Sequence, residues 1–383
     1  MRSFLAAPSS AALLLIALPA CRKPADPAEA AARASEEADG LYVKATSEFL
    51  AGNQDEALKL LDACKALRPE DPRLPAAYGE VYLLMRKLKE ARASFEEAVR
   101  RVPQRATNWT RLGTLQMLVG QDAEATQSFH TALERAPGDF NALEGLGEVA
   151  LKAGRLDEAV KHLVAAADGA PEPARGPMLL RVADLLAEKQ RAAEAALVLK
   201  EAVGRHATLP AQVHARLGEL LVLSGDVEGA RGAWEKAAEL EPSLGNWEIV
   251  GELRLRAGQL DAAGEAFRNA LLPGESAVIR VQLARLALRK GDRVAAELEL
   301  EAALKAARGE EVRESLELAG LLEEMDRKPD ALKLLAVISA EPDHAKDAAL
   351  QLRVAKLARE LENKVETEAA CRRATAAGAA ACP

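Results

Sequence analysis

Histidine and cysteine are the residues of this sequence whose side chains could act as metal ligands, general bases or nucleophiles. The histidines are His130, His162, His206, His214 and His344. None has the spacing of a zinc site, and the nearest pair, His206 and His214, is expected at the surface without a metal. The sequence also lacks glycine-rich phosphate loops and the Gly-x-Ser-x-Gly motif. We therefore expect no catalytic site, no metal and no cofactor, and a protein that is not an enzyme.

Three of the four cysteines lie well beyond the apolar run at the start of the chain. Cys64 takes the place of an alanine that recurs at regular spacing, as at Ala98 and Ala132, so we expect it to be a small buried side chain. Cys371 and Cys382 are close in sequence, and Gly378 between them would let the tail fold back. In an oxidising compartment they could form a disulfide that holds the C-terminus. The alternative is two unpaired thiols, with Cys371 directed into its helix pair.

The fourth cysteine, Cys21, ends that apolar run. Residues 1–20 have the layout of a secretory signal peptide. Leu18-Pro19-Ala20-Cys21 resembles the lipobox of bacterial lipoproteins, in which the cysteine is acylated and becomes the first residue after cleavage. The resemblance implies lipidation at Cys21, detectable with palmitate, and a membrane anchor. The alternative is an ordinary cleaved signal peptide followed by a coincidental cysteine.

The segment after this cysteine differs in composition from everything that follows. Residues 21–37 are rich in proline and charge without an apolar stripe, which predicts a lipid anchor and flexible tether, with some helix possible after Pro27. No later apolar run approaches the roughly 20 residues that cross a bilayer. The chain has a net charge of −8 and no basic patch, which argues against a nucleic-acid partner.

Composition predicts an all-α protein. Hydrophobic residues make up 49% of the chain, mainly alanine and leucine, and aromatic residues only 3%. Apolar residues recur at helical spacing from Leu41 onward, and the chain matches itself with a regular period, which is typical of repeat proteins. Each period contains one small residue at which two helices could cross, here called the crossing residue. The crossing residues are Ala45, Gly79, Gly113, Gly147, Ala183, Gly218, Gly251, Ala284, Ala319 and Ala355.

Large and small residues alternate at fixed places in these periods. The signature positions are Gly79, Ala91, Phe95, Ala98, Trp109, Leu112, Gly113, Ala125, Phe129, Ala132, Gly147, Ala159, Gly218, Ala230, Trp234, Trp247, Gly251, Ala263 and Phe267. Trp109-x₂-Leu112-Gly113 followed by Ala125-x₃-Phe129 and a proline resembles the tetratricopeptide repeat.

The resemblance implies an α-solenoid, a right-handed superhelix of about ten helix pairs over residues 38–381. The expected units are 38–71, 72–105, 106–139, 140–173, 176–210, 211–243, 244–276, 277–311, 312–347 and 348–381. Because a single pair cannot bury its own apolar face, we expect a core shared between successive pairs.

Solenoids of this kind bind partners with the concave surface formed by the first helix of each pair. The sequence places acidic residues beside the crossing residues of these helices: Glu80, Glu144, Glu148, Asp184, Glu219, Glu248 and Glu252. The series changes to Arg285 and Lys356 towards the C-terminus. One interpretation is a groove for a basic or amphipathic segment of a partner. The other is a set of solvated positions that keep the surface soluble.

These features together predict a non-catalytic protein-protein interaction scaffold. By resemblance it would be a lipid-anchored protein of the bacterial cell envelope, facing the periplasm, with the outer membrane favoured because Arg22 rather than aspartate follows Cys21. Two alternatives remain open: an accessory subunit that recruits or regulates an envelope hydrolase or protease, and a soluble secreted binding protein. The sequence does not indicate the oligomeric state.

Overall fold

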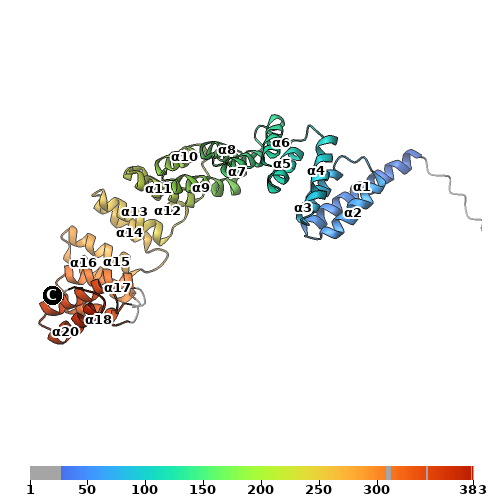
Figure 1. Ribbon diagram of the computed structural model, residues 1–383. Coiled ribbons are helices and arrows are strands. Elements are labelled where there is room, and N and C mark those ends of the chain that lie inside the picture. Colours follow the sequence, from blue (N-terminus) through green and yellow to red (C-terminus); the bar gives the residue numbers. More distant parts are fainter. Residues whose placement is uncertain (1–26, 308–311, 342–343, 381, 383) are drawn as a thin grey trace, which may run out of the picture. The chain divides into compact units, whose positions relative to one another are not determined.

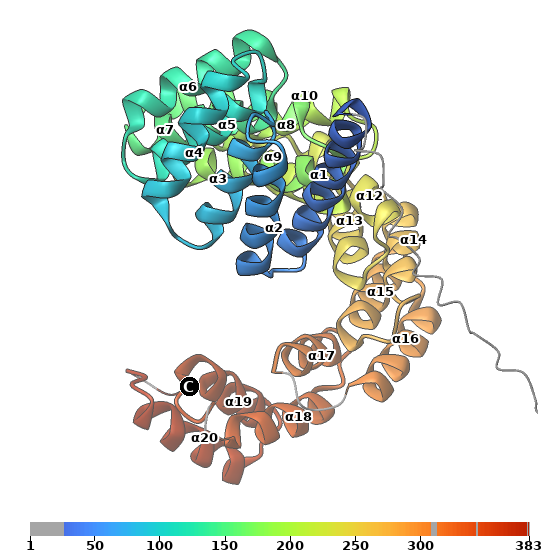
Figure 2. The same ribbon diagram turned by 90° about the vertical axis from the view of Figure 1, so that its right-hand side faces the viewer.

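The computed structural model describes residues 27–307, 312–341, 344–380 and 382. Within these residues every regular element is an α-helix, and the helices follow one another in pairs joined by short turns (Figures 1 and 2). The predicted all-α repeat fold is therefore confirmed. The chain divides into two compact units, residues 1–162 and 163–383, with the boundary inside α8. This division was not predicted from the sequence, and the handedness of the superhelix stays a prediction.

The helices that begin in the first unit are α1 (Pro27–Leu50), α2 (Gln54–Leu67), α3 (Leu74–Leu84), α4 (Leu88–Arg101), α5 (Ala106–Leu118), α6 (Asp122–Arg135), α7 (Phe140–Lys152) and α8 (Leu156–Gly169). Those of the second unit are α9 (Glu172–Glu188), α10 (Ala192–Arg205), α11 (Ala211–Ser224), α12 (Val227–Leu240), α13 (Leu244–Arg256), α14 (Leu260–Ala270), α15 (Ala277–Arg289), α16 (Arg293–Ala306), α17 (Val312–Glu324), α18 (Lys328–Ala340), α19 (Ala348–Glu360) and α20 (Lys364–Ala376).

Two helix pairs begin earlier than the sequence predicted. α1 starts at Pro27, so residues 27–37 of the expected flexible tether are helical. α9 starts at Glu172, inside the unit expected at 140–173. Both helices have a proline in the first turn, Pro27 or Pro173, where the missing N–H costs nothing. The helix after Pro27 agrees with the helical segment allowed there from the sequence, whereas the role of Pro173 at the start of α9 was not predicted.

The core lies between successive pairs. In the first unit, Ala91, Phe95 and Val99 of α4 pack with Leu112 and Leu115 of α5, the first helix of the next pair. In the second unit, one buried cluster extends through the six helices from α15 to α20. Each pair thus covers an apolar face of its neighbour, as a repeat without a core of its own requires.

Glycine at a crossing residue makes room for the aromatic ring of the second helix. A Cβ atom on Gly113 would lie 2.7 Å from the ring of Phe129, and one on Gly218 would lie 2.4 Å from Trp234. No real Cβ atom tolerates such distances without movement of its neighbours. This contact explains why the large and small residues recur in phase along the sequence.

The turn between the helices of each pair needs a residue in the left-handed conformation. The turns described use Gly52, Gly120, Gly154, Gly225, Gly258 and Gly291, or the non-glycine residues Arg86, Gln190, Asp326 and Glu362, which have φ between 57° and 63°. Left-handed backbone costs an L-residue with a side chain about 1 kcal/mol or more. The geometry of the turn is therefore kept even where the sequence offers no glycine.

Candidate binding surface on the first helices

The predicted acidic residues all lie on first helices, and the two units share them. Glu80 is on α3, and Glu144 and Glu148 are on α7, all in the first unit. The second unit has the remaining four, Asp184 on α9, Glu219 on α11, and Glu248 and Glu252 on α13. Each unit therefore has its own set of acidic side chains on this surface.

Arginines from the next first helix neutralise much of this charge. Arg111 of α5 lies 2.6 Å from the Glu80 carboxylate of α3. Arg216 of α11 lies 2.8 Å from Asp184 of α9 and 2.6 Å from Glu219 on its own helix. These residues connect neighbouring first helices, and the surface is less acidic than the sequence indicated.

The same pairing continues towards the C-terminus. Arg313 of α17 lies 3.0 Å from Glu248 of α13. Arg285, which the sequence placed where the charge changes sign, pairs with Glu317 and Glu324 of α17 at 2.5 and 2.9 Å. These ion pairs were not predicted from the sequence. The signal for them is an arginine on one first helix and an acidic residue on another first helix, one or two repeats away.

Two of the acidic side chains, those of Glu80 and Glu248, are largely buried. Burial raises the pKa of Glu80 above the ordinary value for glutamate, and the charge of Arg111 opposes that rise. Burial likewise raises the pKa of Glu248, with Arg313 opposing. In both cases the loss of water outweighs the arginine, because a charge in low dielectric is costly even when paired.

A cavity of about 670 Å³ lies between α5 and α7 and brings Glu144 and Glu148 together. Arg111 and Thr114 of α5 line the same cavity. Asp139 caps the N-terminus of α7 and accepts a hydrogen bond of 2.7 Å from a threonine hydroxyl of α5. The two helices are therefore held together around a hollow with two carboxylates on one wall. A cationic side chain that entered the hollow from a partner could reach these carboxylates.

A second, smaller hollow lies in the second unit. Its volume is about 530 Å³, and it is lined by Gln282, Arg285, Leu288 and Arg289 of α15 with Glu324 of α17. Because Arg285 is already paired with carboxylates, this hollow has mixed charge. Arg285, one of the two cations predicted towards the C-terminus, is therefore balanced by carboxylates.

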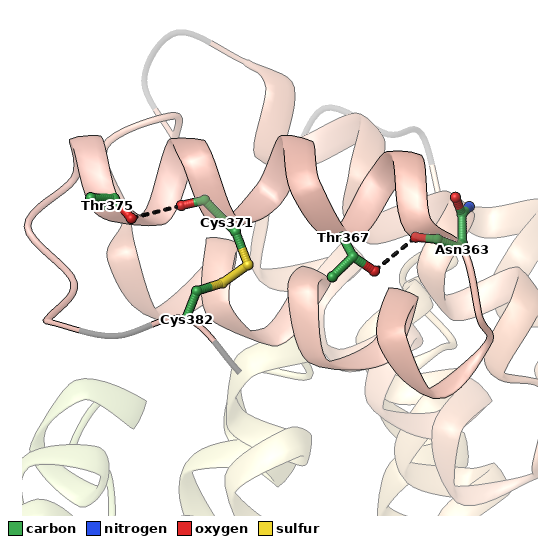
Figure 3. The surroundings of a disulfide bond; sticks show 5 residues. All are labelled: Asn363, Thr367, Cys371, Thr375 and Cys382. Carbon is green, nitrogen blue, oxygen red and sulfur yellow. Dashed lines mark hydrogen bonds between the residues drawn. A yellow bond between two sulfur atoms is a disulfide. The ribbon is translucent and has the colours of Figure 1, made fainter.

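The cysteines beyond residue 26 are either buried or joined. Cys64 is buried, as expected, and its thiol donates to the carbonyl of Ala38 at 3.3 Å. Cys371 and Cys382 form a disulfide with Cα atoms 5.5 Å apart, shown in Figure 3. Both pack against the buried cluster of α15 to α20. Cys21, the predicted lipidation site, lies outside the described residues.

The histidines do not form a site in the described part of the chain, where no group of three or more metal-ligating side chains occurs. His206 lies 2.9 Å from the carboxylate of Asp168. His214 was expected at the surface, but it is buried on α11, and burial lowers its pKa. The residue faces the core because Leu217 and Leu221, three and seven positions later, continue the apolar stripe of that helix.

The fold and this surface define an α-helical repeat protein. The family model described as tetratricopeptide repeat matches residues 110–174 and 180–245, so these parts of the chain consist of such repeats. Among the described residues, no helix has the length and apolar content needed to cross a membrane.

Comparison with solved structures finds several chains with partial similarity. PilW, a type IV pilus biogenesis factor, is 17% identical, with 54% of this chain and 94% of that chain covered and a TM-score of 0.39. YrrB, a TPR protein with an unusual peptide-binding site, is 20% identical, with 61% and 97% covered and a TM-score of 0.32. MamA from Desulfovibrio magneticus RS-1 is 18% identical, with 54% and 96% covered and a TM-score of 0.34. No curated protein matches the sequence.

Proposed function

We propose that this chain is a non-catalytic scaffold that binds partner proteins on its first helices at a bacterial membrane. The observation that carries the proposal is the hollow between α5 and α7, where Glu144 and Glu148 line one wall. Helical repeats use their apolar side chains for stacking, so the surface of the first helices is left for recognition. A partial negative charge in a hollow of this volume favours a basic side chain of a partner.

The anchor is the second part of the proposal. Lipid at Cys21 would place the scaffold at the cell envelope, facing the periplasm and preferably at the outer membrane. The resemblance of residues 18–21 to a lipobox supports this, together with the polar residues that follow. The helix that starts at Pro27 leaves residues 21–26 as the segment between the lipid and the first repeat.

Charge reversal in the hollow tests the binding surface. In cells, crosslinking of the intact protein followed by mass spectrometry should recover a partner, and Glu144→Lys with Glu148→Lys should reduce that recovery about tenfold or more. The matched control is Glu124→Lys with Glu134→Lys on α6, which makes the same change in net charge on exposed positions of a second helix. Equal recovery from both variants would refute the proposed surface.

Labelling with palmitate tests the anchor separately. The intact protein should incorporate the label and sediment with membranes, and Cys21→Ala should abolish both properties. Wild-type protein that carries no label and stays in the soluble fraction would make the chain a secreted soluble binding protein. Cys21→Ala protein that remains fully membrane-bound would refute Cys21 as the anchor.

A further inference from the structure

Three leucines at the same place in the first three pairs are exposed to solvent. Leu50, Leu84 and Leu118 each follow the crossing residue by five positions, at the end of α1, α3 and α5. Their exposed fractions are 78%, 54% and 58%. Single exposed leucines are ordinary, but three in register on neighbouring repeats form an apolar row. We refer to these three residues as the leucine row.

The repeat fold does not need leucine at this place. In the later pairs the equivalent residues are Lys152, Glu188, Leu223, Arg256, Arg289, Glu324 and Glu360. Six of these seven are charged, and the helices that contain them form the same pairs. Stacking therefore does not account for the leucine row, and an exposed apolar row is costly unless something covers it.

The leucine row lies on the same face as the acidic positions. Leu84 is four residues after Glu80, and Leu118 is four residues after Thr114, so each pair of positions shares one helix face. Met117, next to Leu118, lines the hollow that contains Glu144 and Glu148. The apolar row on α1, α3 and α5 therefore adjoins the carboxylates of α7 within the first unit.

The end of the row is marked by a change of residue type. Lys152, the equivalent residue of α7, donates to the Met117 carbonyl at 3.1 Å and to the Asp122 carboxylate at 3.0 Å. The Lys152 ammonium group thus links α7 to the preceding helix pair. Helix α7 also contributes the side chains of Glu144 and Glu148 to the lining of the hollow. The leucine row thus ends at the fourth pair, beside the hollow that Glu144 and Glu148 line.

We propose that the leucine row binds an amphipathic helix of a partner protein, with lysine or arginine at the end that reaches α7. The proposal rests on the function proposed above and names the class of partner for that surface. The ion pair of Arg111 on α5 with Glu80 on α3 shows that successive first helices lie within side-chain reach of one another. A helix laid across α1, α3 and α5 would therefore meet the leucines with apolar residues that recur along one of its faces.

Charge distinguishes this partner from helix α16 of a second copy of the chain. An apolar pair on the outer side of this protein's own helices, Val294 and Leu298 of α16, is also exposed. Glu297 and Glu301 flank it on the same helix. Docking of that helix would bring glutamates towards the carboxylates of α7, which is unfavourable, whereas a basic helix would find opposite charge.

Selection of peptides from a display library of helical sequences, each three heptads long, on the intact chain tests the inference. We expect the selected peptides to repeat apolar residues about every seven positions and to have lysine or arginine at one end. The triple variant Leu50→Gln, Leu84→Gln and Leu118→Gln should bind them about tenfold more weakly or worse. The matched control is Leu223→Gln, at the equivalent place of α11 and 71% exposed, which should bind as wild type does.

Other variants separate the parts of the inference. Glu144→Gln with Glu148→Gln should weaken binding of peptides with a basic end and leave peptides with that end neutralised unchanged. Selected peptides without the apolar repeat, or binding that is equal in the triple variant and wild type, would overturn the inference. So would a wild-type dimer in sedimentation analysis that the triple variant abolishes, because a second copy would then cover the row.

The outcome also separates this inference from the proposed function. If partner recovery in cells depends on Glu144 and Glu148 but not on the leucine row, only the amphipathic helix is wrong. If neither substitution changes recovery, the binding surface itself is wrong.

Discussion

Removal of the Cys371–Cys382 disulfide should loosen the last helix pair and no other. The bond closes a short loop, with a sequence separation of 11 residues. The tail folds back beyond Gly378, where φ is 94°, and Ala379 donates to the carbonyl of Ala374 on α20. Cys371 stands where other pairs have Phe129 or Phe267, four residues after the small position of the second helix. The disulfide thus takes the place of a buried ring at the end of the core.

The magnitude follows from the length of the loop. Chain entropy gives about 2.8 kcal/mol for a closed loop of this size at 25 °C. Since about 1.4 kcal/mol is a factor of ten in an equilibrium, opening of α20 should become about 100-fold more frequent. The effect should remain local, because in a repeat protein each pair is stabilised only by its neighbours.

Hydrogen exchange measures this directly. In the variant Cys371→Ser with Cys382→Ser, amides of α20 should exchange faster by about that factor, while amides of α3 and α4 should not change. Reductant should reproduce the effect in wild type and have none in the variant, which is the control for other actions of the reductant. Equal exchange of α20 with and without the bond would refute the argument, as would a loss of protection spread evenly over both units.

Three further changes address the crossing, the turn and a buried carboxylate. Gly113→Ala should destabilise the protein by about 1–3 kcal/mol in urea unfolding, because its Cβ would lie 2.7 Å from a ring, whereas Gly138→Ala, with nothing within 4 Å, should be near neutral. Glu362→Gly, at φ 57°, should stabilise by up to about 1 kcal/mol, and a lower unfolding midpoint would contradict the left-handed strain. The hydrogen bond from Arg73 lowers the pKa of Asp71, so the stability it supplies is full above the ordinary carboxyl pKa and is lost as pH falls below it. The difference in unfolding free energy between wild type and Asp71→Asn should therefore shrink below about pH 4, and a difference independent of pH would contradict the pairing.

The pairing of helices was predictable because it depends on size and period. A ring such as Trp234 and a crossing residue such as Gly218 must occur together, since a Cβ at that glycine would overlap the ring. Such a constraint is visible in one sequence when it recurs from period to period. The helix pairs and the shared core follow from this alternation with helical spacing.

The charges of the surface were predicted only in part. An acidic residue such as Glu80 could be placed on the first helix from its distance to the crossing residue. Its neutralisation by Arg111 was not predicted, because an arginine one repeat away does not by itself show how far its side chain reaches between the first helices of successive repeats. The helical period assigns each side chain to a face of its own helix. The net charge of the surface depends in addition on ion pairs between neighbouring helices.

The first and last helix pairs differ in the residues on their outer faces. Later first helices have a buried apolar residue just before the crossing residue, as at Leu112 and Leu217, but α1 has the exposed Lys44 there. Another pair stacked on this face would bury that ammonium group, which is unfavourable without a partner charge. At the other end, Cys371 and Cys382 of the disulfide pack against the buried cluster of α15 to α20. A reductant cleaves the disulfide but does not react with lysine. Redox conditions should therefore change the stability of α20 and leave the face of α1 unchanged.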